Sequence, residues 1–119
     1  MKLYKREAYG IKFPVLEQNV LPPKPYDALN FAGFIWVRNI DVLTENVMRH
    51  EAIHTIQARA LWYVPYYVWY VSEYLIRLVY CMNHGLAYSN ISFEREAYEN
   101  EEKIEYKNER KRFDFLKYI

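Results

Sequence analysis

The sequence predicts a mainly helical α+β domain, in which three helices follow an N-terminal extended arm and one or two short strands. Four of the five prolines and Gly10 fall between Tyr9 and Asn30, which leaves no helical periodicity there. After residue 40 the chain has long segments without Gly or Pro, as helices require. A chain of 119 residues fits one domain. We therefore expect a single domain over 1–119, with the arm and strand in 1–40 and a helical core in 41–119.

The segment from Phe31 to Asn39 predicts a strand because it is short and rich in aromatic and β-branched residues. Alternation along a strand would place Phe34, Trp36 and Arg38 on one face. Ile35 and Val37 would then lie on the opposite face.

Three helices are predicted after this strand. Asp41 and Thr44 are suitable N-caps for the first, which runs through NVMRHEAIHTIQARALWYV. Pro65 either kinks this helix or begins the second, which contains YYVWYVSEYLIRLVYCM. The loop CMNHGLAYSN should separate the second helix from a polar third helix over about 92–112.

Composition excludes several classes of protein. Hydrophobic residues make up 52% of the chain, which excludes a disordered or collagen-like protein. A net charge of +1 argues against a nucleic-acid partner, which would require a basic excess. The N-terminal residues lack the apolar run of a signal peptide, so we expect a cytoplasmic protein, with the inner face of the membrane as an alternative location.

Residues 50–54 carry the pattern HExxH within the first predicted helix. Residues four apart lie on one face of a helix, so the imidazoles of His50 and His54 can converge on one ion, for which Zn²⁺ is the expected choice. Glu51 projects about 100° further round the helix and could act as general base beside the metal. The chemistry indicated is hydrolysis of a peptide-like bond in a peptide or protein substrate. The alternatives are a surface helix with two exposed histidines, or a core histidine that is hydrogen-bonded to a carbonyl.

A catalytic zinc ion needs a third protein ligand. The spacing HExxHxxGxxH is absent, because Gln57 and Ala60 occupy the required positions. His84 lies thirty residues beyond His54 in a predicted loop. The remaining candidates are carboxylates of the third helix: Glu94, Glu96 and Glu99.

The segment Glu94-Arg95-Glu96-Ala97-Tyr98 resembles the ExxA(D) signature of gluzincins, the zincins in which a glutamate ligates zinc. The resemblance implies a zincin-like metal-binding core in which Glu94 is the third ligand, with Glu96 ranking second. Gluzincins usually have Asp four residues after the ligand, where this chain has Tyr98. Orientation of the ligands would then fall to Tyr98, Glu99 or another group.

The combination of NVMRHEAIHTIQ with the later AYSNISFEREAYENE is similar to small proteins of Bacteroidetes-type bacteria that pair an HExxHxxQ helix with a FEREAY segment. The resemblance covers about residues 31–119. It implies a zinc metallopeptidase and supplies no substrate.

The aromatic segment between Arg59 and Glu73 has thirteen uncharged residues, fewer than the about 20 that cross a bilayer as a helix. Two interpretations are open. The second helix could be the buried centre of a small bundle. Alternatively, the rings of this segment could form a surface that lies in a membrane interface: Trp62, Tyr63, Tyr66, Tyr67, Trp69 and Tyr70.

Two classes of function follow. The first is a minimal gluzincin-like metallopeptidase, with substrate added along the Phe34, Trp36 and Arg38 strand and a tyrosine or His84 stabilising the oxyanion. The second is a non-catalytic zinc-binding module that docks on a partner protein or a membrane interface. The small size leaves room for a partner chain that completes the cleft.

Overall fold

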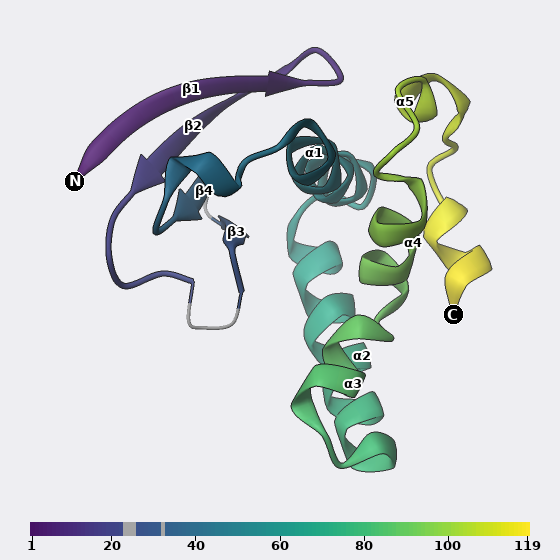
Figure 1. Ribbon diagram of the computed structural model, residues 1–119. Helices are drawn as coiled ribbons and strands as arrows, with labels where there is room; N and C mark the ends of the chain where they lie inside the picture. The colour runs from purple at the N-terminus through teal and green to yellow at the C-terminus, as the bar shows by residue number, and fades with distance from the viewer. Residues whose placement is uncertain (23–25, 32) are drawn as a thin grey trace. The chain divides into compact units, whose positions relative to one another are not determined.

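The computed structural model describes residues 1–22, 26–31 and 33–119. The chain forms two compact units, Met1–Ala52 and Ile53–Ile119, and the division falls within helix α1 (Glu45–Ala60). Each unit is described separately, and Figure 1 traces both.

The first unit is built on a four-stranded mixed sheet. Its strands are β1 (Lys2–Ala8), β2 (Ile11–Glu17), β3 (Ala28–Phe31) and β4 (Phe34–Val37), in the order β1-β2-β4-β3. β1 and β2 are antiparallel, β2 and β4 are parallel, and β3 and β4 are antiparallel. The prediction of an extended arm with one or two strands leading into a three-helix zincin-like core is therefore wrong. The fold is α+β, with the sheet as a full element.

The prolines were expected to exclude regular structure from this part of the chain, yet Pro14 lies within a strand. Pro14 is inside β2 opposite Lys5, but β2 pairs with β4 only from Val15 onward. Proline has no N–H, but this is tolerated at position 14 because β2 makes no hydrogen bond with β4 there. Tyr9 and Gly10 both have positive φ, as a tight two-residue hairpin turn requires. Residues 23–25, which include two of the prolines in the predicted arm, lie outside the described residues.

One face of this sheet is apolar. Ile11, Phe13 and Val15 alternate inward on β2, and Ile35 and Val37 do so on β4. The predicted alternation is thus confirmed over Phe34–Val37. The predicted bounds, Phe31 to Asn39, are wrong, because Phe31 ends β3 and β4 stops at Val37; residue 32 lies outside the described residues. The predicted cap is confirmed as well, because Thr44 Oγ1 accepts the N–H of Val47 at the start of α1.

The second unit is helical. It contains the end of α1, then α2 (Val64–Cys81), α3 (His84–Ser89), α4 (Ser92–Asn100), α5 (Tyr106–Glu109) and a 3-10 helix η2 (Asp114–Tyr118). Pro65 lies in the first turn of α2, so it begins a helix rather than kinking one. The segment predicted as a loop forms α3, beside α2 in Figure 1.

The predicted third helix ends early, at Asn100 instead of Arg112. Glu99, Glu101 and Glu102 lie at or just beyond its C-terminus, where the helix dipole disfavours negative charge. The Asn100 side chain also donates to the carbonyl of Glu96 at 2.7 Å. The chain then turns into α5 and η2, and η2 packs against α4.

The core of this unit is aromatic. Phe93 packs against Tyr66 and Phe115 with ring centroids 4.6 Å apart in both pairs, and it stacks on Tyr70. Ala58, Leu61 and Ile91 complete this core. Much of the tyrosine content of α2 therefore holds α4 in place.

Candidate metal centre

Two helices supply a cluster of ligand atoms. His50 and His54 lie one turn apart on α1, and Glu94 lies in the first turn of α4. The ligand atoms of these three residues all lie within 4.8 Å of one another. Their exposed fractions are 6%, 8% and 2%. The alternative of two exposed surface histidines is excluded, and the three residues could hold a metal ion.

The distance between His54 and Glu94 suits two ligands of one ion. His54 Nε2 lies 3.1 Å from Glu94 Oε1. Two ligands at about 2.0–2.1 Å from a tetrahedral metal are about 3.3 Å apart. The pair is therefore close to the separation that shared coordination demands.

Gln57 determines the tautomer of His54, that is, which of its two ring nitrogens carries the proton. The Gln57 Nε2 group donates to the carbonyl of Phe93 at 3.0 Å and to Glu96 Oε1 at 3.1 Å, both of which only accept. The other amide atom, Oε1, is consequently the one that lies 2.9 Å from His54 Nδ1. The Nδ1 proton is donated to it, which leaves Nε2 directed at the Glu94 carboxylate.

This arrangement calls for a cation. With Nδ1 protonated, a neutral His54 presents a lone pair to a carboxylate oxygen at 3.1 Å. Either a proton on Nε2 or a metal ion between the two atoms makes the contact favourable. A donor set of two imidazoles and a carboxylate, with one imidazole oriented by an amide, fits a divalent transition metal.

Tyr70 of α2 fixes the second oxygen of Glu94. Its hydroxyl donates to Glu94 Oε2 at 2.6 Å. Burial and the neighbouring Glu94 charge raise the pKa of Tyr70 far above its ordinary value of 10.0. The hydroxyl thus stays protonated and remains a donor, leaving Glu94 Oε1 on the side of His54.

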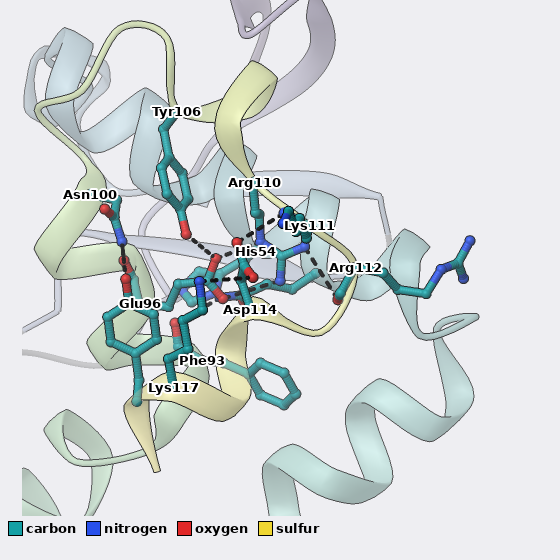
Figure 2. A network of polar contacts seen from close by, with 12 residues as sticks. His54, Phe93, Glu96, Asn100, Tyr106, Arg110, Lys111, Arg112, Asp114 and Lys117 are labelled. Carbon is teal, nitrogen blue, oxygen red and sulfur yellow. Dashed lines mark hydrogen bonds and ion pairs between the residues drawn. The ribbon is translucent and has the colours of Figure 1, made fainter.

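Glu96 has a different role, as Figure 2 shows. Its fully buried carboxylate accepts hydrogen bonds from Arg110 Nε and Nη2, and from the Tyr106 hydroxyl at 2.7 Å. Gln57 adds a further bond. Because Arg110 bonds both of its carboxylate oxygens, Glu96 forms a buried ion pair that stabilises the fold. Of these two carboxylates, Glu94 is the one that lies beside His54.

The other residues predicted for the site are distributed as follows. Glu51 is buried and adjacent to His50, and its backbone carbonyl accepts from the Asn30 side chain at 3.0 Å. Tyr98 is 52% exposed and Glu99 is exposed, so the support of Glu94 comes from Tyr70 instead. His84 begins α3 and its Nδ1 lies 2.7 Å from the Tyr74 hydroxyl. That contact orients His84 toward α2.

The predicted substrate strand is an interior strand. β4, which carries Phe34 and Trp36, has β2 on one side and β3 on the other. Arg38 follows β4 and donates to the carbonyl of Tyr26 at 3.0 Å. Edge addition of a peptide to β4 is thus excluded, and within the described sheet the edges are β1 and β3.

Three residues around the ligands were not predicted to support the site: Gln57, Tyr70 and Arg110. The signal for Gln57 was its position three residues after His54, which puts both side chains on one face of α1. Tyr70 and Arg110 come from other elements and carry no local signal.

Comparison of the chain with protein-family models, with curated proteins and with solved structures finds no match. A function must therefore be inferred from the residues of the site.

Proposed function

We propose that this chain is a zinc-dependent metallopeptidase of the gluzincin type. The observation that carries the proposal is the meeting of His50 and His54 with Glu94, a carboxylate forty residues further along the chain. Two histidines and a glutamate are the protein ligands of several zinc peptidases, which leave a fourth position open. When bound, zinc would polarise a substrate carbonyl and lower the pKa of water.

In this proposal the residues of the chain have separate roles. His50, His54 and Glu94 bind the metal. Glu51, buried next to His50, accepts a proton from the attacking water and passes it to the leaving amine. Gln57 holds the His54 ring through Nδ1, and Tyr70 holds the Glu94 carboxylate through Oε2.

Glu51→Gln tests the catalytic role. The variant is nearly isosteric and lacks the base, so it should retain zinc and lose cleavage of a peptide library. His50→Ala should lose zinc as well as cleavage. Glu45→Gln, at an exposed position of the same helix, is the matched control and should keep both properties. Equal cleavage by wild type and Glu51→Gln would contradict the proposal.

A non-catalytic zinc-binding module is the second candidate. Burial of all three ligands favours it, because structural zinc sites are closed to solvent. The two candidates differ in the fourth position of the metal. In a cobalt-substituted protein, a small anion such as azide should shift the visible spectrum only if that position is open.

A further inference from the structure

Helix α2 is apolar on its outward face as well as on the face that packs in the aromatic core. Its charged residues, Glu73 and Arg77, are half-buried and pair with each other at 2.9 Å, while Tyr70 reaches Glu94. The outward face is aliphatic, with exposed fractions from 53% to 75%. We call these residues the α2 face: Val64, Val68, Val71, Leu75, Ile76 and Val79.

The α2 face is large for an exposed surface. All six aliphatic side chains are more than half exposed and follow one helix, whereas exposed apolar side chains on a typical monomer are scattered singly. A mainly apolar groove of about 620 Å³ continues the face toward Ile119. Val68, Ile76 and Tyr80 are among its lining residues, and the ion pair of Glu73 with Arg77 also lines it. Contiguous apolar patches of this kind mark interaction sites.

Cations and aromatic rings surround the N-terminal end of this face. Trp62 is 68% exposed, and the Arg112 guanidinium lies 5.0 Å from the centroid of its ring. Arg59 is exposed nearby and its Nε contacts the Tyr63 hydroxyl at 3.4 Å. At the other end of α2, Tyr80 and Met82 are more than four-fifths exposed. An aliphatic face with an aromatic and cationic rim is typical of helices that lie in a membrane interface.

We propose that the α2 face binds the surface of an anionic lipid bilayer. The valines, Leu75 and Ile76 enter the boundary of the acyl chains, and Trp62 lies at the level of the headgroups. Arg59 and Arg112 pair with lipid phosphates, which gives the charge complementarity that selects lipid over a second copy of this chain, whose rim carries the same charge. None of the described helices is both long and apolar enough to cross a membrane.

The aromatic rings of α2 do not lie where the sequence-based interpretation of an interfacial segment places them. That interpretation placed Tyr66 and Tyr70 among the residues in the interface, yet both face the core of the second unit. The outward residues are instead the aliphatic ones. Because Tyr70 also contacts Glu94, the inward face of the same helix supports the metal centre. The lipid proposal stands independently of any catalytic activity.

Vesicle cosedimentation tests this proposal with the full chain. Wild type should sediment with vesicles of phosphatidylcholine and phosphatidylglycerol, less with pure phosphatidylcholine, and less at high salt. Val68→Gln with Leu75→Gln should weaken binding at least tenfold. Arg59→Gln and Arg112→Gln should each weaken binding to the anionic vesicles about fivefold. Ile104→Gln, at an equally exposed apolar position outside α2, is the control and should bind as wild type.

Trp fluorescence supplies a second readout, because Trp62 and Trp69 flank the face. Lipids brominated along the acyl chains should quench wild type on binding and should leave the double variant unquenched. Absence of sedimentation with either vesicle would overturn the proposal. So would a wild type that is dimeric in solution and made monomeric by the double variant, since a second copy would then cover the face.

Discussion

Arg110 and Glu96 form an ion pair in which the two side chains are 2% and 0% exposed. Arg110 approaches Glu96 with Nε and Nη2, one on each carboxylate oxygen. Glu96 also accepts from Gln57, and Gln57 bonds His54. The segment after α4 is therefore connected to a proposed metal ligand by three consecutive polar contacts.

Removal of Arg110 should leave Glu96 as a buried, uncompensated charge. We expect Arg110→Ala to lower the free energy of unfolding by about 3–5 kcal/mol. Arg110→Lys should recover part of it, because lysine keeps the charge and loses the two-pronged geometry. Urea unfolding of the metal-free proteins measures both. A loss below about 1 kcal/mol for Arg110→Ala would contradict a structural role for the pair.

Gln57 should control metal affinity through the orientation of His54. Gln57→Met preserves length and volume but offers no acceptor to Nδ1 and no donor to Glu96. Loss of such an outer partner typically lowers metal affinity 10–100-fold. Competition with a chromophoric chelator measures zinc affinity directly.

The control for Gln57 is Glu45→Gln on the exposed side of α1. It should bind zinc as wild type does. Gln57→Asn offers a finer comparison, because the amide is retained but is one methylene too short to reach both partners. Unchanged affinity in Gln57→Met would show that His54 is oriented by other contacts.

Tyr70 should make stability fall at high pH. Burial and the Glu94 charge raise its folded pKa above the unfolded value of 10.0. The contribution of Tyr70 to the free energy of unfolding is complete below pH 10. It decreases above pH 10, because there the tyrosine ionises in the unfolded state and stays protonated in the folded state. Each such group lowers the free energy of unfolding by about 1.36 kcal/mol per pH unit above that point.

Tyr70→Phe isolates this contribution. The alkaline limb of the stability profile should become less steep in the variant than in wild type. Denaturant unfolding at several pH values provides the measurement. Identical slopes in wild type and Tyr70→Phe would contradict the assigned cause of the pKa shift.

The clustering of His50 and His54 could be predicted from sequence because helical spacing is local information. His50 and His54 are four residues apart, and α1 is a continuous helix through both. Glu94 was selected on its short surrounding pattern, and the cluster confirms that it lies beside them. Thr44 and the Ile35/Val37 face were likewise correct because each depends on neighbours in the chain.

The sheet and the support of the ligands could not be predicted in this way. β2 tolerates Pro14 only because β4 pairs with it from Val15 onward, and that depends on a strand twenty residues later. The third helix was expected to run to Arg112, yet Arg110 folds back onto Glu96. Nothing in the local charge pattern distinguished Glu96 as the buried partner. Tyr98 was the tyrosine expected to support Glu94, but Tyr98 is exposed and the hydroxyl that reaches Glu94 is that of Tyr70, on another helix.

Glu73 of α2 should stabilise the helix that carries Glu94. Its carboxylate accepts from the backbone N–H of Ser92 at 2.7 Å and from the Ser92 hydroxyl at 2.6 Å, at the start of α4. A negative charge there also complements the helix dipole. Glu73→Gln replaces an acceptor by a donor and should lower the free energy of unfolding by about 1–3 kcal/mol. Glu99→Gln, exposed on the same helix, should change it by less than about 0.5 kcal/mol.

A double-mutant cycle of Glu73→Gln with Ser92→Ala separates this contact from the pairing of Glu73 with Arg77. The coupling energy between Glu73 and Ser92 should be about 1–2 kcal/mol, because the charge-assisted bond between the hydroxyl and the carboxylate is absent from either single variant. Ser92 lies two residues before Glu94, so fraying of the first turn should also displace a metal ligand. Zinc affinity should accordingly fall in Glu73→Gln and remain unchanged in Glu99→Gln. A coupling energy near zero, with unchanged zinc affinity, would mean that the first turn of α4 is held by the Phe93 packing alone.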